Sequence, residues 1–363
     1  LHSAITAALA FNIAACSSGT DVAGIGGSGI TPTASVISSG TITGFGSIFV
    51  NGVEFETGAS TFSIDDNSGT EDDLAIGMVV TVTGSINEDS VSGTAVSVSF
   101  DDQLQGPVSN VSAVDADGIT RTITVLGTVV LLDINTTSFD VSGTVSGSFN
   151  FNNINVEDNV EVSGFFDSAG VLKATRVELK EDTFVAGSSI VELKGTITAL
   201  TGTTFSLEGV SGITVDASSA SIEDLSGLAN GAVVEVKGTC LDSSCSTLTA
   251  MRVEGQSLGF DDDDEVEIEG IITRFVNDSD FDVNGFPVNA SNAVKEPTSF
   301  VLGIDKEVEV EGTVVNGVLV ATKIADEGGD IKIAATVTAV DSAAGSFELT
   351  PVSGQPAIIV EID

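Results

Sequence analysis

Apolar and polar residues alternate along many short segments of this chain, and glycines stand at the ends of these segments. In GAVVEVKG, residues 231–238, two valines fall on one side of an extended backbone, and Glu235 and Lys237 fall on the other. In residues 307–311 the side chains expected to point outward are those of Glu307, Glu309 and Glu311. A period of two residues is typical of a β-strand with one buried face. The pattern therefore predicts strands with valines inward, charged residues outward and glycines at the turns.

Three such sequence motifs, which we call phrases, recur in the same order along the chain. The first is GTITG at 40–44, which returns in related form at 106–110, 195–199, 270–274 and 335–339. The second, G-x-x-V-x-V-x-G, closes at Gly84, Gly164, Gly238 and Gly312. The third is Ala-x-x-Val/Ile, at 95–98, 174–177, 250–253 and 321–324. A fixed period marks a tandem array, and a unit of about 70 residues with five or six strands has the size of a small Greek-key barrel. We therefore predict an all-β chain of tandem small OB-like β-barrels, arranged as beads on a string.

The phrases also predict the limits of each unit. The expected order is a signal-like segment 1–19, a Gly/Ser-rich leader 20–39, barrel repeats 40–104, 105–184, 193–257 and 265–327, with an acidic linker 258–264 and a partial fifth repeat 328–363. Asn-Gly pairs predict hairpin turns at 51–52, 284–285 and 316–317. Helical periodicity is limited to about one turn near 71–77 and 222–231.

Together, these phrases and the opening GTITGFGSIFVNG, residues 40–52, resemble a bacterial repeat family known as domain of unknown function 5666. The resemblance covers about residues 24–330, and the second copy departs from it by an insertion around 127–150. It implies a small β-barrel repeat in an exported or lipid-anchored protein. It brings no catalytic residues with it.

The composition of the chain excludes several classes of function. The chain has 53 Asp+Glu against 12 Lys+Arg, a net charge of −41, which disfavours nucleic acid and anionic membrane surfaces and suits divalent cations. It has no Trp, no Tyr and one histidine, His2, so mechanisms and zinc sites that need an imidazole are excluded from the body. We expect no catalytic residue and no enzyme. A catalytic alternative would require a pocket ringed by acids with raised carboxylate pKa values.

The beginning of the chain has the features of an export signal. Residues 4–15 form an uncharged apolar run that is too short to span a bilayer but suits a signal peptide. The run leads into Ile13-Ala14-Ala15-Cys16, which resembles a bacterial lipobox and implies lipidation of Cys16. Ser17 would then favour the outer membrane. The alternative is an apolar strand or helix kept in the mature protein. We predict a protein at the cell surface or outside the cell, with membrane contact only through Cys16.

Two cysteines and three acidic segments are further candidates. Cys240 and Cys245 are expected to form a disulfide in an oxidising compartment, the alternative being free thiols. Residues 278–285 fit the first half of an EF-hand loop, but a strand running into an Asn-Gly turn is favoured because position twelve is Ser291. The acid runs 65–73 and 261–265 are typical of solvated loops, and we hypothesise weak Ca²⁺ occupancy between modules, at Asp261, Asp262, Asp263 and Asp264. No other cofactor is expected.

The fifth repeat lacks the later phrases. A truncated sequence explains this as well as strand addition between subunits does. In the second case, residues 30–37 would complete a neighbour's last barrel through Ile30, Ala34 and Val36 and build a head-to-tail fibre. We therefore predict a non-enzymatic structural or adhesive surface protein that associates with itself. The alternative is a surface lipoprotein that binds divalent cations or polysaccharide.

Overall fold

The computed structural model describes residues 35–65, 67–116, 118–143, 145, 147–256, 259–328, 336–341, 346–350 and 358–361. Strands β1 to β28 and one short 3-10 helix, η1 (Glu71–Asp73), are the elements of this part. The helical turn predicted near 71–77 is thus present, whereas residues 222–231 contain the end of a strand and bends. None of the described helical residues belongs to a helix long and apolar enough to cross a bilayer. The predicted all-β class is confirmed.

Repeat 1 is a closed barrel of five strands. The strands of the repeat, including one hairpin outside the barrel, are β1 (Ser35–Phe45), β2 (Ile48–Val50), β3 (Val53–Glu56), β4 (Thr61–Ile64), β5 (Asn67–Gly69), β6 (Val79–Ile86) and β7 (Ser92–Phe100). Hydrogen bonding runs in a ring from β1 through β2, β3, β7 and β6 back to β1. Only the β3–β7 contact in this ring is parallel. The β4–β5 hairpin lies outside the ring and adds to β7.

The same ring returns three times. Repeat 2 holds β8 (Leu104–Val111), β9 (Thr120–Val125), β10 (Thr128–Asp133), β11 (Ser138–Val141), β12 (Asn159–Phe166) and β13 (Leu172–Glu181). Repeat 3 holds β14 (Ile190–Thr201), β15 (Thr204–Leu207), β16 (Thr214–Asp216), β17 (Ser221–Glu223), β18 (Val233–Cys240) and β19 (Thr247–Gly255). Repeat 4 holds β20 (Glu265–Asn277), β21 (Asp280–Val283), β22 (Phe286–Asn289), β23 (Val294–Glu296), β24 (Glu307–Val315) and β25 (Val318–Asp326). The predicted tandem small barrels are confirmed.

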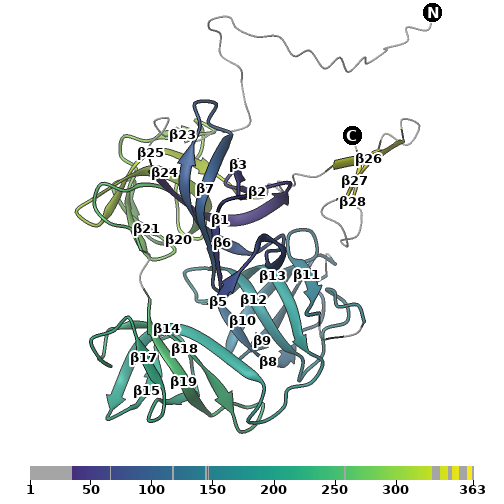
Figure 1. Cartoon of the computed structure of the whole chain (residues 1–363), viewed down its shortest axis with the longest axis vertical. Coiled ribbons are helices and arrows are strands. Elements are labelled where there is room, and N and C mark those ends of the chain that lie inside the picture. The colour runs from purple at the N-terminus through teal and green to yellow at the C-terminus, as the bar shows by residue number, and fades with distance from the viewer. Residues whose placement is uncertain are drawn as a thin grey trace, which may run out of the picture.

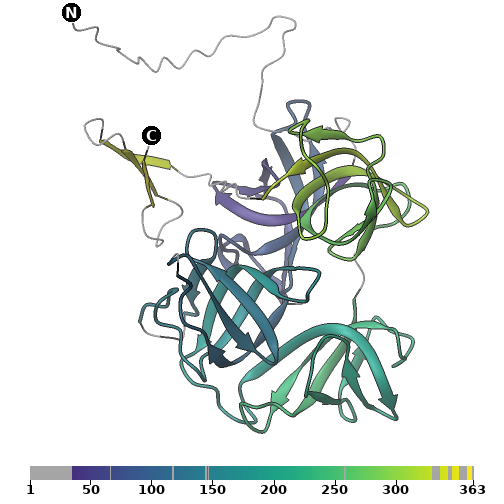
Figure 2. The same ribbon diagram turned by 180° about the vertical axis from the view of Figure 1, so that it is seen from behind.

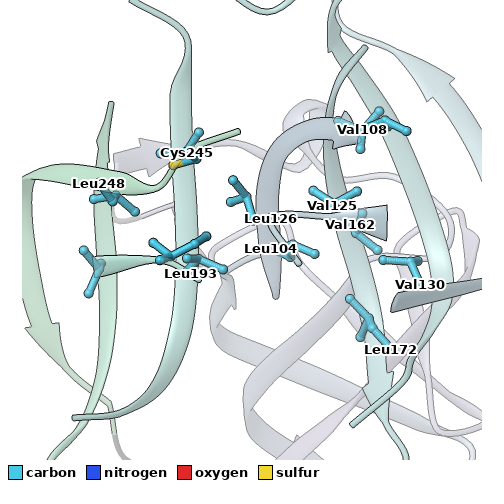
Figure 3. Close-up of a cluster of buried hydrophobic side chains, with 14 of the residues drawn as sticks. Leu104, Val108, Val125, Leu126, Val130, Val162, Leu172, Leu193, Cys245 and Leu248 are labelled. Carbon is cyan, nitrogen blue, oxygen red and sulfur yellow. The ribbon is translucent and has the colours of Figure 1, made fainter. Parts of the chain in front are cut away.

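The alternating valines fill these barrels as predicted. Val80 and Val82 of β6, and Val308 and Val310 of β24, are almost completely buried. Repeats 2 and 3 share one continuous apolar cluster, whereas repeats 1 and 4 each have their own. Figure 3 shows the shared cluster, in which Leu104 and Leu193 lie between the two barrels. These two leucines are register partners across β8 and β14.

The closing glycine of each G-x-x-V-x-V-x-G phrase lies inside a paired strand, not at a turn. The strand register shifts at all four, Gly84, Gly164, Gly238 and Gly312. A Cβ at these positions would overlap a carbonyl oxygen of the partner strand. A β-bulge bends a strand and increases its twist, which is what closing a small barrel requires. The prediction that glycines mark turns holds for the opening residues Gly77 and Gly231, which have positive φ.

The barrels pair with one another through their first strands. β1 runs parallel to β20, so repeats 1 and 4 form one 13-stranded sheet, and β8 pairs with β14, so repeats 2 and 3 form a 12-stranded sheet. In both Figure 1 and Figure 2, repeat 4 lies beside repeat 1, and repeats 2 and 3 lie below them. Repeat 4 therefore folds back onto repeat 1. Because β1 begins at Ser35, residues 35–39 of the predicted leader belong to the first barrel.

The predicted fifth repeat supplies three strands to the described part. They are β26 (Thr336–Asp341), β27 (Ser346–Thr350) and β28 (Ile358–Glu361), which form an antiparallel sheet. The ATVTA phrase at 335–339 predicts strands of this kind, because it is the first phrase of a repeat. Val337 and Val340 of β26 are 51% and 71% exposed.

Candidate functional site

Several charged residues that point away from the barrel cores are nevertheless buried. Glu235, Glu309 and Glu311 are 2%, 4% and 0% exposed, although their positions in the alternation predict outward faces. The alternation identifies which side chains leave the core of their own barrel. Pairing between barrels then covers this outer face with a second barrel. The outward carboxylates are consequently enclosed at the junctions between repeats.

One such junction joins repeats 1 and 4. Here one carboxylate oxygen each of Glu267, Glu309 and Glu311 lies within 4.8 Å of the other two, and we call these residues the Glu267 cluster. Lys323 Nζ lies 2.7 Å from Glu311 Oε1 and 3.8 Å from Glu309 Oε1. Ser38 Oγ of repeat 1 donates a hydrogen bond of 2.9 Å to Glu267 Oε2. A lysine ammonium thus already neutralises part of this cluster.

Burial sets the protonation of the Glu267 cluster. It raises the pKa of Glu267 well above the ordinary value, and the neighbouring charges of Glu309 and Glu311 raise that pKa further. A protonated Glu267 removes one of three negative charges next to a single lysine. Two carboxylates, Glu309 and Glu311, then remain next to Lys323.

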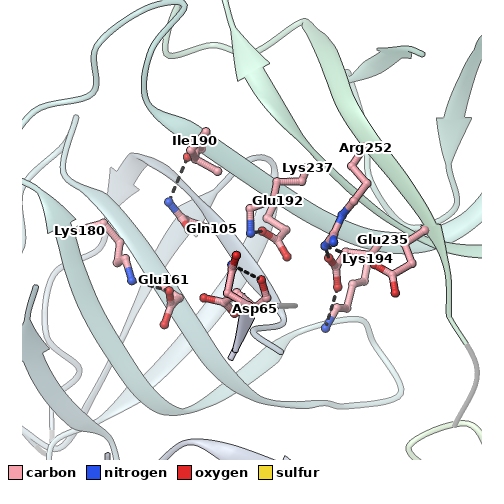
Figure 4. A network of polar contacts seen from close by, with 12 residues as sticks. Asp65, Gln105, Glu161, Lys180, Ile190, Glu192, Lys194, Glu235, Lys237 and Arg252 are labelled. Atoms are coloured by element: carbon pink, nitrogen blue, oxygen red, sulfur yellow. Dashed lines mark hydrogen bonds and ion pairs between the residues drawn. The ribbon is translucent and has the colours of Figure 1, made fainter. Parts of the chain in front are cut away.

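A second junction brings together parts of repeats 1 and 2. Asp65 lies in the turn between β4 and β5, Asp102 in the segment that joins β7 to β8, and Glu161 on β12. One carboxylate oxygen of each lies within 4.8 Å of the other two, and we call this set the Asp102 cluster. Figure 4 shows the Asp65 side chain pointing into the space between Glu161 and Glu192. Asp65 adopts a positive φ of 44°, a backbone conformation that Asp tolerates better than most residues.

The bases around the Asp102 cluster contact glutamates. Lys180 Nζ lies 2.7 Å from Glu161 Oε2, and Lys237 Nζ lies 2.7 Å from Glu192 Oε2. Glu235 forms ion pairs with Lys194 at 3.3 Å and with Arg252 at 3.2 Å (Figure 4). By contrast, Asp102 is 1% exposed, and neither of its carboxylate oxygens has a hydrogen-bond partner among the described residues.

Burial and like charges dominate the acid–base properties of this region. Burial raises the pKa of Asp102 well above the usual range, and the carboxylates of Glu192 and Glu161 raise it further. Burial also raises the pKa of Glu161, although the ammonium of Lys180 opposes the effect. For Glu235, burial raises the pKa to about 8 even though Lys194 lowers it. At neutral pH this region holds more acid than its bases neutralise.

A cavity of about 340 Å³ adjoins the Asp102 cluster. Asp65, Asp73, Glu161, Glu178 and Lys180 contribute its polar lining. An acid-ringed pocket with raised carboxylate pKa values is what the catalytic alternative required. The carboxylates of the cluster converge on a shared point, as the oxygen ligands of one cation do. The arrangement suits cation binding.

The predicted metal residues Asp261, Asp262, Asp263 and Asp264 are not brought together as ligands. They form the turn before β20, where Asp264 Oδ2 accepts a hydrogen bond from the Asp261 N–H at 2.7 Å. Asp262 Oδ1 accepts one from the Gly317 N–H at 2.9 Å. Consecutive residues in a turn point in different directions, so these carboxylates serve separate backbone groups. Among the described residues, the carboxylates that converge are those of the Glu267 and Asp102 clusters.

The EF-hand-like segment 278–285 contains strand β21, as the sequence analysis predicts. Phe281 and Val283 of β21 are fully buried. Asp280 and Asp282 lie on the other face and bind Arg274 of β20 at 2.6 and 2.7 Å. These carboxylates therefore form a cross-strand ion pair with the arginine.

The predicted disulfide between Cys240 and Cys245 is present, and both cysteines are buried. Cys16, Ile30 and Ala34 lie outside the described residues. The role predicted for Val36 in strand exchange is corrected, because its side chain is fully buried in β1 of its own barrel. β1 is paired on one edge with β6 and on the other with β20, so this part of the strand is already used within the chain.

The members of the Asp102 cluster were only partly accessible to sequence analysis. Asp65 belongs to the acid run 65–73, for which calcium between modules was hypothesised. Asp102 and Glu161 were missed, because they are far apart in sequence and no spacing rule joins them. The remaining signal was the position of Asp102 in the short segment between β7 and β8, where the chain passes from one barrel to the next.

The closed five-stranded rings and their recurrence define a tandem small-β-barrel repeat protein. A family model described as a domain of unknown function (DUF5666) matches residues 36–99, 105–178, 194–254 and 269–325, more than half of the chain. The chain belongs to this family, and the resemblance inferred from the phrases is confirmed. A search of curated proteins finds no match to the chain.

Proposed function

We propose that this chain is a non-catalytic structural protein of the cell exterior, in which the four barrels are joined into one acidic body. The observation that carries this proposal is the pairing of strands between barrels. Val36–Ser39 of β1 pair with Glu265–Ile268 of β20, and Leu104 and Gln105 of β8 pair with β14. Modules joined only by flexible linkers would not need a shared sheet.

Contacts between the two barrel pairs support the same function. Thr175 Oγ1 of repeat 2 donates a hydrogen bond of 2.6 Å to the Gly77 carbonyl of repeat 1. The Ser168 N–H of repeat 2 donates one of 2.8 Å to Asp305 Oδ1 of repeat 4. Gly77, Ser168 and Asp305 lie in turns, and Thr175 lies on β13. Both hydrogen bonds therefore join a repeat of one pair to a repeat of the other.

The charge and the disulfide support a location outside the cell. Disulfides persist in oxidising compartments, and the net charge of −41 favours solubility. Anchoring through Cys16 at the outer membrane or cell surface is part of the proposal and rests on the lipobox resemblance alone.

The proposal is tested on bacteria that produce the full chain. Surface biotinylation of intact cells is expected to label the chain, and negative-stain microscopy is expected to show it as a compact body or an ordered assembly at the surface. A chain that is labelled only after lysis would contradict the location. Cleavage of a polysaccharide by the purified chain that is lost in Glu161→Gln would contradict the non-catalytic role.

Self-association is a second candidate, favoured by the exposed valines of β26. Val337 and Val340 are the apolar side chains that a second copy would cover. Sedimentation velocity of the purified chain is expected to show a concentration-dependent larger species that Val340→Asp reduces. If the chain remains a monomer at all concentrations, this candidate is wrong.

A further inference from the structure

We propose that Asp65, Asp102 and Glu161 bind a calcium ion at the junction between repeats 1 and 2. This goes beyond the structural role above, because it assigns a ligand to a particular site. The Asp102 cluster contributes side chains from three separate segments of the chain. An ion held there would join the β4–β5 turn to the connecting segment and to β12.

The geometry allows all three carboxylates to contact one ion. Calcium binds oxygen at about 2.3–2.6 Å, so two oxygens on the same ion are at most about 5 Å apart. One oxygen of each carboxylate in the Asp102 cluster lies within 4.8 Å of the others. The neighbouring cavity of about 340 Å³, which Asp65 and Glu161 also line, has room for water molecules that would complete the coordination shell.

Asp102 gives an independent reason to place a ligand here. It is 1% exposed, and both of its carboxylate oxygens are without a hydrogen-bond partner in the described part of the chain. Asp65 Oδ1 is likewise buried and unpartnered. An unsatisfied buried carboxylate is costly, and proteins generally pair such groups with cations or protons.

The bases nearby do not fill this role. Lys180 is 2.7 Å from Glu161 Oε2 at one side of the cluster, and Lys237 is 2.7 Å from Glu192 Oε2 at the other. No described lysine or arginine forms an ion pair with Asp102 or Asp65. In the Glu267 cluster, by contrast, Lys323 lies 2.7 Å from Glu311 and 3.8 Å from Glu309, and Ser38 donates a hydrogen bond to Glu267.

The donor set selects the class of ion. All three side chains offer carboxylate oxygens, which hard cations prefer, and none offers nitrogen or sulfur. Calcium accepts irregular coordination and 6–8 oxygen ligands, whereas magnesium requires near-octahedral geometry and keeps most of its water. Three carboxylates from separate loops and strands suit the more tolerant ion. Affinity on the order of 10⁻⁴–10⁻³ M is typical of extracellular calcium modules.

The experiment uses the full chain after dialysis against a chelator. Calorimetric titration with CaCl₂ at pH 7.5 is expected to show saturable binding, and millimolar Ca²⁺ is expected to raise the melting midpoint by several degrees. Magnesium at equal concentration is expected to give a smaller shift of the midpoint.

Asp102→Asn keeps the shape of the side chain and removes the ligand charge, so the calcium-dependent shift should be lost. Asp262→Asn, in the acidic turn before β20, is the matched control and should keep the shift. If Asp102→Asn fails to fold, Asp65→Asn takes its place, because Asp65 is less deeply buried. No binding heat and no shift with millimolar Ca²⁺ would overturn the proposal, as would an unchanged shift in the variants that fold.

Discussion

At the residue scale, the closing glycines allow the barrels to close. β24 changes register against β25 at Gly312, where a Cβ would overlap the carbonyl oxygen of Val320. Backbone on an adjacent strand cannot yield as a flexible side chain can. The repeated glycine in the second phrase is thus explained by close approach of two strands.

We expect Gly312→Ala to lower the free energy of unfolding by about 2 kcal/mol, the usual range for overpacking. Gly303→Ala, in the same repeat, is the control, because a Cβ there meets nothing within 4 Å. Urea denaturation of both variants checks the difference. Equal effects of the two substitutions would show that the bulge tolerates a side chain.

Glu267 gives a pH-dependent prediction. Its folded pKa is raised above the ordinary 4.5, so its contribution to stability is complete below about pH 4.5 and is lost as the pH rises through the folded value. Glu267→Gln mimics the protonated form and lacks this loss. We expect the variant to gain stability relative to the natural chain as the pH rises from 5 to 8, by up to about 1.4 kcal/mol per pH unit.

Denaturant midpoints at pH 5 and pH 8 measure this difference. Glu265→Gln, on the same strand but outside the cluster, serves as control and should follow the natural chain. A difference between Glu267→Gln and the natural chain that does not change with pH would mean that Glu267 is not protonated in the folded state.

At the element scale, sequence periodicity predicted the strands but not what covers them. Val308 and Val310 are buried as the alternation predicts, and Glu309 and Glu311 point away from that core as it also predicts. Glu309 and Glu311 are nevertheless buried, and Glu267 beside them contacts Ser38 of β1, more than two hundred residues earlier in the sequence. Local patterns carry no information on such long-range contacts. The Asp102 cluster was missed for the same reason.

The disulfide at the end of β18 is a local feature that sequence analysis could predict. It links Cys240 to Cys245 with a sequence separation of 5, and loop-closure entropy for so short a loop corresponds to about 2 kcal/mol. We expect the double variant Cys240→Ala and Cys245→Ala to lose about this amount. Chemical denaturation with and without reductant checks it, since reductant should destabilise the natural chain and leave the double variant unchanged.

At the scale of the whole molecule, the barrels form two pairs. Repeats 1 and 4 share one sheet and repeats 2 and 3 share the other, so chain order does not decide which repeats support each other. The two barrels of each pair should therefore move and unfold together. A local change at the junction of repeats 1 and 4 should therefore reach both of these repeats, although repeats 2 and 3 separate them in sequence.

Ser38→Asp tests this coupling. Ser38 is fully buried on β1 and contacts Glu267, so the substitution adds a fourth carboxylate to the Glu267 cluster and should cost about 3–5 kcal/mol. Hydrogen exchange of the full chain is expected to become faster in β6, β7, β24 and β25 and to change little in β18 and β19. Ser109→Asp, an exposed position on the first strand of repeat 2, is the control and should leave all barrels protected. Faster exchange confined to repeat 1 would show that the shared sheet does not couple the two barrels, and each repeat would then be an independent folding unit.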